Sequence, residues 1–192
     1  MRIDVVVANE SHYIYADEIC DEIFISARER GTGIARRTPE YLKQKMAAGK
    51  AVIALTKDKR FAGFSYIESW GGKEYVANSG LIVAHEFRGM GIAMKIKRRI
   101  FALSRELFPE AKIFSITTGE AVMKMNHKLG FRPVTFAALT KDEEFWKGCQ
   151  GCRNWEILKS NDFKMCLCTG LLYDPKEHVK KTRKPKVEQE NK

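Results

Sequence analysis

Several features that would place a chain in a membrane or on a secretory route are missing from this sequence. No apolar run approaches the ~18 residues that a membrane-spanning helix needs, and the opening MRIDVVVANE lacks the long apolar segment of a signal peptide. Internal repeats are missing too, as are basic motifs interleaved with aromatic residues, so neither a repeat scaffold nor a nucleic-acid-binding protein is favoured. We therefore expect a cytoplasmic protein with no membrane partner.

The composition is that of an ordinary folded domain with an excess of basic residues. Of the 192 residues, 44% are hydrophobic and 30% are charged, which suits one domain with a real core. The formal net charge is +10, and residues 176–192 account for +4 of it. This end of the chain has too few apolar side chains to fold, so we predict a disordered basic tail over 175–192. The remaining +6 favours an anionic ligand, such as a phosphorylated cofactor or an acidic metabolite.

The first half of the chain alternates strand and helix patterns. Residues 3–7 are rich in β-branched side chains and predict a strand, whereas the apolar spacing over 13–30 predicts a helix. Thr38-Pro39 is a typical start for a second helix, which should run to about residue 48. Three strands joined by short polar turns should then pair as an antiparallel meander: 51–56, 61–69 and 75–84.

The second half is organised around one long amphipathic helix. Its apolar stripe recurs every three or four residues before Pro109: Ile92, Ile96, Ile100, Leu103 and Leu107. A strand over 112–117 follows, and two strands joined by a crossover helix form a parallel pair. A helix over 119–129 and a strand over 133–140 come next. The sequence thus predicts an α+β fold with a mixed central sheet.

The stretch GLIVAHEFRGMGIAMKIKRR, residues 80–99, places a basic, glycine-containing turn between a strand and the long helix. The N–H groups at a helix N-terminus are unpaired and lie at the positive end of the helix dipole, so they bind anions. Gly89 and Gly91 would let a phosphate approach the backbone, and Arg88 would add charge-assisted hydrogen bonds. A plain strand-to-helix turn is the alternative interpretation.

The same turn resembles the Q/R-x-x-G-x-G/A motif of the Gcn5-related N-acetyltransferase (GNAT) superfamily, which Arg88-Gly89-Met90-Gly91-Ile92-Ala93 matches. LIVAHEF resembles the fourth strand of that family, and NHKLGF at 126–131 resembles its later helix. The resemblance spans residues 1–140 and implies a GNAT fold, with the pyrophosphate of acetyl-CoA or another acyl-CoA on this turn. The pantetheine arm would pair with the strand backbone at Leu81, Ile82 and Val83. We therefore expect an acyl-CoA-dependent N-acyltransferase, with acetyl-CoA as the leading donor.

Transfer to an amine needs a base, an oxyanion donor and a proton for the leaving thiolate. A backbone N–H of the fourth strand could stabilise the oxyanion. Glu68 and Glu74 could each act as the base through a water, and Ser79 could face the amine, although all three could equally be without a role. The resemblance implies a tyrosine as the acid four residues before Gly130. This chain has Asn126 there, so the acid stays unassigned.

A narrower resemblance concerns the acceptor. GIARRTPEYLKQKM and IFSITT are similar to the acyltransferase domain of bacterial N-acetylglutamate synthases, in which an arginine-bearing segment faces an acidic amino acid. Arg36 and Arg37 stand at the matching place and could clamp a carboxylate, or they could be exposed loop cations. A small amine, such as glutamate or a related acidic amino acid, is the resulting hypothesis for the acceptor, and a homodimer is compatible with it.

Four of the five cysteines lie in one short segment. Cys149 and Cys152 form a C-x2-C pair, and thirteen residues later Cys166 and Cys168 form a C-x-C pair that would share one face of a strand. Four thiolates are the ligand set of a tetrahedral structural zinc, and a reducing compartment favours metal over disulfides. Four buried thiols in an apolar core are the alternative. We assign Cys20, far away in the chain, to the core.

These patterns divide the chain into an acyltransferase domain (1–140), a cysteine-containing extension packed on it (141–174) and the tail. Three other functions stay open: a protein or RNA acetyltransferase, a CoA-binding sensor that transfers nothing, and a zinc-containing module that binds nucleic acid or protein. The intact motif at the turn favours an acyltransferase over a binding module.

Overall fold

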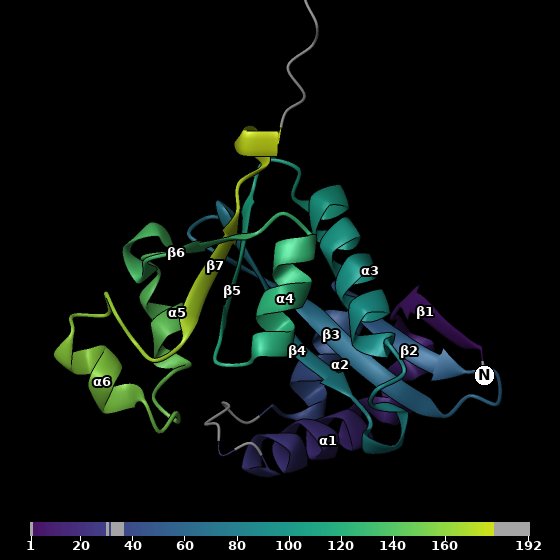
Figure 1. Cartoon of the computed structure of the whole chain (residues 1–192). Helices are drawn as coiled ribbons and strands as arrows, with labels where there is room; N and C mark the ends of the chain where they lie inside the picture. The colour runs from purple at the N-terminus through teal and green to yellow at the C-terminus, as the bar shows by residue number, and fades with distance from the viewer. Residues whose placement is uncertain (1, 30, 32–36, 179–192) are drawn as a thin grey trace, which may run out of the picture.

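The computed structural model describes residues 2–29, 31 and 37–178, and its centre is a seven-stranded sheet (Figure 1). The strands lie in the order β1-β2-β3-β4-β5-β7-β6. All neighbours are antiparallel except β4 and β5, which are parallel, so the predicted α+β fold with a mixed sheet is confirmed. The strands are β1 (Ile3–Val7), β2 (Ala51–Thr56), β3 (Phe61–Trp70), β4 (Tyr75–Val83), β5 (Lys112–Thr117), β6 (Arg132–Val134) and β7 (Thr169–Tyr173).

Six α-helices lie in the described residues: α1 (Ala16–Glu29), α2 (Pro39–Ala47), α3 (Ile92–Leu107), α4 (Glu120–Lys128), α5 (Glu143–Lys147) and α6 (Trp155–Ser160). Short 3-10 turns accompany them: η1 (Glu10–Tyr15), η2 (His85–Phe87), η3 (Phe136–Ala138) and η4 (Pro175–His178). Helix α2 begins as its sequence predicts, because the Thr38 hydroxyl accepts the N–H of Tyr41 at 3.2 Å. None of the helices described is both long and apolar enough to cross a bilayer.

Three predicted elements differ in the structure. The first helix opens with the 3-10 turn η1 before α1 starts at Ala16. The strand predicted over 133–140 is wrong beyond Val134, because the chain there turns into η3, which buries Phe136. The strand predicted at Cys166 and Cys168 is also wrong. β5 ends at Thr117 opposite Thr169, so no partner strand remains for the residues before Thr169.

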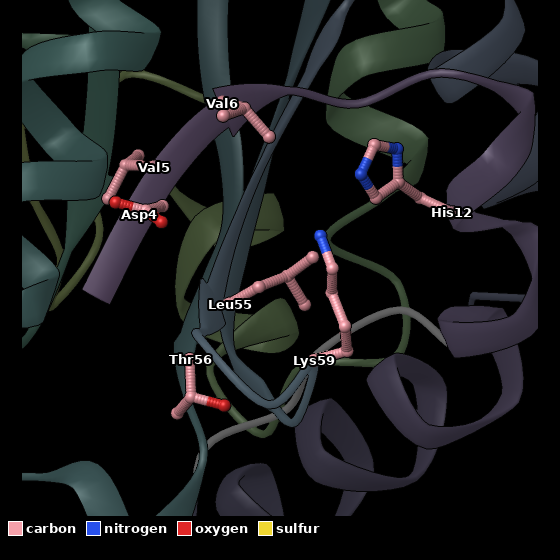
Figure 2. Close-up of a pocket in the computed structure, with 7 residues that line it drawn as sticks. All are labelled: Asp4, Val5, Val6, His12, Leu55, Thr56 and Lys59. Carbon is pink, nitrogen blue, oxygen red and sulfur yellow. The ribbon is translucent and has the colours of Figure 1, made fainter. Parts of the chain in front are cut away.

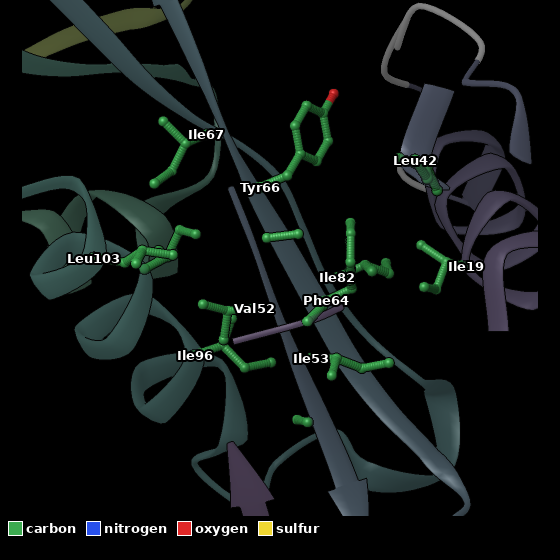
Figure 3. Close-up of a cluster of buried hydrophobic side chains, with 14 of the residues drawn as sticks. Ile19, Leu42, Val52, Ile53, Phe64, Tyr66, Ile67, Ile82, Ile96 and Leu103 are labelled. Carbon is green, nitrogen blue, oxygen red and sulfur yellow. The ribbon is translucent and has the colours of Figure 1, made fainter. Parts of the chain in front are cut away.

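The two faces of the sheet are covered by different helices. Helices α1 and α2 bring Ile19 and Leu42 onto one face, and α3 packs Ile96 and Leu103 against the other (Figure 3). The central strands between them are buried on both faces, as in β2, where every residue is buried. This packing holds α3, the helix of the strand–turn–helix motif, against the sheet.

A second apolar cluster lies where α1 and α2 do not reach. On the strands β4, β5 and β7, alternate residues divide between the clusters: Ile113 and Leu171 join the main core, whereas Phe114 and Leu172 join the second. Trp146 of α5 and Leu158 of α6 cover this second cluster. The segment that we predicted to be an extension thus covers part of the sheet and, through β7, contributes a strand to it.

The end of the chain lies only partly within the described residues. Residues 175–178, the first of the predicted disordered tail, form η4, and the Glu177 carboxylate pairs with the Arg132 guanidinium at 2.6 Å. His178 stacks on Tyr173 with 4.3 Å between ring centroids. Residues 179–192, which carry most of the predicted tail, lie outside the described residues, as does Arg36.

Candidate functional site

The strands β4 and β5 pair over a short distance and then separate. Tyr75, Val76 and Ala77 pair with β5, whereas the rest of β4 has its described partner on β3 alone. The stretch with Leu81, Ile82 and Val83 therefore presents a strand edge toward the opening. Such an edge can hydrogen-bond an extended ligand, because its N–H and C=O groups have no strand beside them. This is the position at which the resemblance predicts the pantetheine arm.

A bulge in β4 shapes the same opening. The register between β3 and β4 shifts between Phe64 and Tyr66, opposite Gly80. Gly80 has φ +62°, and a Cβ at this position would lie 2.4 Å from Cε1 of Tyr66. A glycine is therefore required there both by the backbone and by the close approach of the tyrosine ring.

The turn from β4 into α3 has the geometry of an anion site. Gly91 caps α3 with φ +73° and Gly89 has φ +82°, both in the left-handed region that favours glycine. The next N–H groups, of Ile92 and Ala93, have no acceptor within the helix. No acidic residue lies in the first turn of α3, and Met90 at the tip of the turn is 56% exposed. The backbone can therefore receive a phosphate group here.

Arg88 does not lie free beside this turn. Its Nε donates to the carbonyl of Val83 at 3.3 Å, and its Nη1 donates to the Glu29 carboxylate at 3.1 Å, with Glu22 at 3.9 Å. The side chain thus connects the turn to α1. It would contact a phosphate only after it leaves Glu29.

A cluster of polar side chains lies on the α2 side of β3 and β4, with Glu68 at its centre. The Tyr41 hydroxyl donates to one oxygen of the Glu68 carboxylate, and the Ser79 hydroxyl donates to the other at 3.0 Å. Two of the predicted catalytic residues, Glu68 and Ser79, are therefore in direct contact. With both oxygens held, the carboxylate has a defined orientation beside β4.

Two cations and two tyrosines complete this cluster, which we call the Glu68 cluster: Arg37, Tyr41, Lys45, Tyr66, Glu68 and Ser79. The Arg37 Nε donates to the Tyr66 hydroxyl at 2.6 Å. The Lys45 ammonium lies 4.8 Å from the centre of the Tyr41 ring, and that ring meets the Tyr66 ring edge-on at 5.8 Å. Figure 3 shows the Tyr66 hydroxyl pointing out of the hydrophobic core. Two positive side chains thus lie around one carboxylate.

Burial changes how these groups ionise. Burial raises the pKa of Tyr66 to about 12, with a further contribution from Glu68 and an opposing one from Arg37. Burial also raises the pKa of Tyr41, as does its hydrogen bond to Glu68. The pKa of Lys45 is lowered by burial, although Glu68 acts in the opposite direction. Both tyrosines are therefore un-ionised at neutral pH, and neither is a base.

The other two predicted catalytic residues lie apart from this cluster. Glu74 sits on the exposed turn before β4, and its carboxylate is 3.8 Å from the Lys112 ammonium. Asn126 lies on α4 and is fully buried, and neither its amide nitrogen nor its amide oxygen has a partner among the described residues. A buried amide without partners is unusual, because desolvation without a hydrogen bond is costly.

Lys97 is a second unexpected buried polar group. It lies on α3, is 1% exposed, and its ammonium is 5.5 Å from the centre of the Phe131 ring. Burial lowers its pKa to about 8. The stripe of isoleucines on α3 gave no indication of this residue.

A pocket of about 320 Å³ opens away from the Glu68 cluster, at the edge of the sheet, beside β1 and the turn after β2 (Figure 2). Its lining includes His12, Leu55 and Lys59 but none of the residues of the Glu68 cluster or of the β4–α3 turn. We therefore place the candidate site by its chemistry and backbone geometry.

Sequence analysis missed Tyr41, Lys45 and Tyr66, although spacing could have indicated them. Tyr41 and Lys45 are four residues apart and so share one face of α2, with Arg37 just before that helix. Tyr66 and Glu68 are two residues apart and share one face of β3. The spacing alone does not show that this face of α2 meets this face of β3.

The fold, the separated strands β4 and β5 and the glycine turn together define the class: the chain has the fold of the GNAT acetyltransferases. No protein-family model matches the sequence, and no curated protein matches it. Solved structures do match it. The N-acetylglutamate synthase from Neisseria gonorrhoeae, complexed with coenzyme A and N-acetyl-glutamate, superposes with a TM-score of 0.61 at 13% identity over 91% of this chain. This chain spans 35% of that one, about a third of its length.

Two further structures match over most of their own length. A Mycobacterium tuberculosis protein in complex with CoA gives a TM-score of 0.63 at 15% identity, over 89% of this chain and 98% of that one. A phosphinothricin acetyltransferase from Sinorhizobium meliloti in complex with acetyl-CoA gives 0.61 at 13% identity, over 91% and 89%. At these identities the likeness establishes the fold.

Proposed function

We propose that this protein is an acyl-CoA-dependent N-acyltransferase, with acetyl-CoA as the leading donor and the amine of glutamate or a related acidic amino acid as the acceptor. The observation that carries the proposal is the Glu68 cluster, in which a carboxylate held by two hydroxyls shares one polar cluster with two cations beside the opened edge of β4. The fold supports the donor, and the cluster supports the acceptor.

The donor half of the site is built from backbone. The pyrophosphate would bind the N–H groups at the start of α3, with Gly89 and Gly91 leaving room for it. The pantetheine arm would pair with β4 at Leu81 and Val83. The buried amide of Asn126 would then find a polar partner on the acyl-CoA, which accounts for its lack of one within the protein. Three solved structures of the same fold carry CoA or acetyl-CoA, which supports this half.

The acceptor half has charges that complement an acidic amino acid. Such a molecule carries two carboxylates and one ammonium, and the cluster offers two cations, Arg37 and Lys45, and one carboxylate, Glu68. The Arg37 guanidinium, whose Nε donates to Tyr66, could give a charge-assisted hydrogen bond to a carboxylate of the acceptor. The N-acetyl-glutamate in the Neisseria structure supports a small acidic acceptor for this fold.

The cluster also supplies the proton acceptor for the reaction. Glu68 would take a proton from the substrate ammonium, directly or through one water, so that the amine lone pair can attack the thioester carbonyl. The N–C bond forms and the C–S bond breaks. The oxyanion would be stabilised by a backbone N–H of β4 near Ile82, and CoA leaves as its thiol after taking up a proton. Ser79 and Tyr41 hold Glu68 in position for this step.

The decisive test is a panel assay. The purified chain is incubated with acetyl-CoA or succinyl-CoA and single amino acids, and the products are identified by mass spectrometry. We expect acylated glutamate or an acylated near relative. CoA binding without transfer to any small amine would overturn this acceptor and direct the search to protein or RNA amines or to a CoA sensor.

A matched pair of variants connects the result to the site. Arg37→Gln should raise KM for the acidic acceptor roughly tenfold to a hundredfold, because a charge-assisted pair is lost. Arg99→Gln on the outer side of α3, whose partner is the exposed Glu106 at 3.1 Å, should leave KM unchanged. Equal KM values for the two variants would remove Arg37 from the acceptor site.

A further inference from the structure

The cysteine segment has no part in the proposed transfer, and its structure calls for a separate explanation. We propose that Cys149, Cys152, Cys166 and Cys168 bind a single zinc ion, which fastens the α5–α6 segment onto the second apolar cluster of the sheet. The proposal is independent of the acceptor and of the acyl donor.

The C-x2-C pair sits in a tight turn that begins as α5 ends. The N–H of Cys149 donates to the carbonyl of Trp146 at 2.9 Å, and the N–H of Cys152 donates to the carbonyl of Cys149 at 2.9 Å. The N–H of Asn154 then donates to the Cys152 sulfur at 3.5 Å. A backbone N–H directed at a sulfur stabilises a thiolate, which is the form that binds zinc.

The C-x-C pair approaches this turn from the other side. Cys149, Cys166 and Cys168 all pack against the same second apolar cluster, although thirteen residues separate the two pairs. The turn that holds Cys149 also holds Cys152, whose N–H donates to the carbonyl of Cys149. The two cysteine pairs therefore meet at the second apolar cluster.

In the structure, the four sulfurs are not arranged around one metal-binding position. Within residues 2–29, 31 and 37–178, no three His, Cys, Asp or Glu side chains have the geometry of a formed metal site. Zinc binding would require the C-x-C loop to bring Cys166 and Cys168 to the C-x2-C turn. The C-x-C loop lies outside the sheet, and its neighbouring side chains Met165 and Leu167 are 59% and 66% exposed.

The segment also needs a cross-link more than the rest of the fold does. Helices α5 and α6 have five and six residues, too few to be stable without tertiary support. Small units with little regular structure are commonly held by a metal or by disulfides. The described cysteines are all unpaired and only half-buried, so they are neither disulfides nor fully packed core thiols. Four half-buried thiols of this kind suit zinc.

Two hydrogen bonds connect this segment to other parts of the fold. Asp142 accepts the N–H of Gly71 at 3.0 Å, on the turn between β3 and β4. Arg153, next to Cys152, donates to the carbonyl of Gly31 at 3.2 Å, at the end of α1. A zinc ion would therefore stabilise the turn that carries Glu74 and the end of the helix that carries Glu29.

The test begins with the metal content of the full chain, purified without chelators or affinity metal and measured by mass spectrometry. We expect one zinc per chain, and release of that zinc when a mercurial reagent blocks the thiols. Zinc-free protein with five freely titrating thiols would overturn the proposal.

A matched variant set locates the metal. Cys149→Ser with Cys152→Ser should lose zinc, whereas Cys20→Ser, a half-buried cysteine on α1, should retain it. If the double variant fails to fold, the wild-type chain refolded with Co²⁺ gives a direct measurement. Four thiolates around cobalt produce the intense visible absorption of a tetrahedral sulfur site. Zinc retained by the double variant, or a cobalt spectrum without that absorption, would contradict the assignment.

Discussion

The β4–α3 turn and the Glu68 cluster form the two halves of one candidate site, yet they are built differently. The turn consists of consecutive residues, and its chemistry comes from backbone N–H groups that two glycines expose. The cluster consists of side chains from α2, β3, β4 and the segment just before α2, and its first and last members, Arg37 and Ser79, are 42 positions apart. A backbone site can be recognised as a motif, whereas a side-chain site exists only after distant segments meet.

The largest effect should come from Glu68, the proposed general base of the Glu68 cluster. Glu68→Gln should lower kcat by ~10²–10⁴ because proton transfer is lost, while the hydrogen bond from Ser79 is retained. Glu74→Gln is the matched control, since its carboxylate is exposed and paired with Lys112 at 3.8 Å. Steady-state rates with saturating acetyl-CoA measure both. Equal losses in the two variants would show that Glu68 is not the base.

A pH-dependent effect on stability should come from the buried Lys97 on α3. Burial lowers its pKa from 10.5 to about 8, so below pH 8 both the folded and the unfolded chains carry the charge, and folding bears the full cost of burying it. Between about pH 8 and pH 10.5 the folded chain releases the proton first, and stability from this group rises with pH. Lys97→Met should therefore raise the free energy of unfolding by about 3 kcal/mol at pH 7, and by much less at pH 10.

Chemical unfolding at a series of pH values measures this effect. Lys95→Met, an exposed position on the same helix, serves as the control and should change stability little at any pH. A difference between Lys97→Met and wild type that stays constant with pH would mean that Lys97 is not buried as a charge.

A smaller effect should come from the bulge that joins the two halves. Gly80→Ala places a Cβ 2.4 Å from the Tyr66 ring and forces alanine to φ +62°. We expect a loss of about 2 kcal/mol in the free energy of unfolding, from overpacking and backbone strain. Gly49→Ala has a similar φ of +63° with nothing within 4 Å, and it isolates the strain. Equal losses would show that the contact with Tyr66 has no cost.

The smallest effect should come from the turn itself. Gly91→Ala adds a Cβ that meets nothing within 4 Å, so only the strain at φ +73° and any bound phosphate oppose it. We expect acetyl-CoA to bind about tenfold more weakly by calorimetry, a change of about 1.4 kcal/mol. Gly72→Ala, at φ +64° on the β3–β4 turn, carries the same strain and should leave the affinity unchanged. Equal affinities would remove the turn from the CoA site.

The predictions from sequence succeeded for local features and failed for contacts between distant segments. The antiparallel meander, the parallel pair and the long helix were predicted correctly, because each has its own period or punctuation. The strand over 133–140 was predicted too long, because the chain turns into η3 after Val134 and buries Phe136. That burial depends on contacts with distant segments. Glu68 and Ser79 were predicted one by one, and their contact came from the structure. Tyr41, Lys45 and Tyr66 were not predicted at all.

By itself, the sequence determined the α+β class, the strand–turn–helix with its left-handed glycines, and a segment rich in cysteine. These features are local, because backbone conformation and residue spacing are set over a few residues. The tertiary structure alone decided which carboxylate is held by two hydroxyls, which cations surround it, and which side of the sheet the cysteine segment covers. Those outcomes depend on which faces of α2 and β3 come together, and burial, which shifts the pKa values of Tyr66 and Lys97, exists only after the chain has packed.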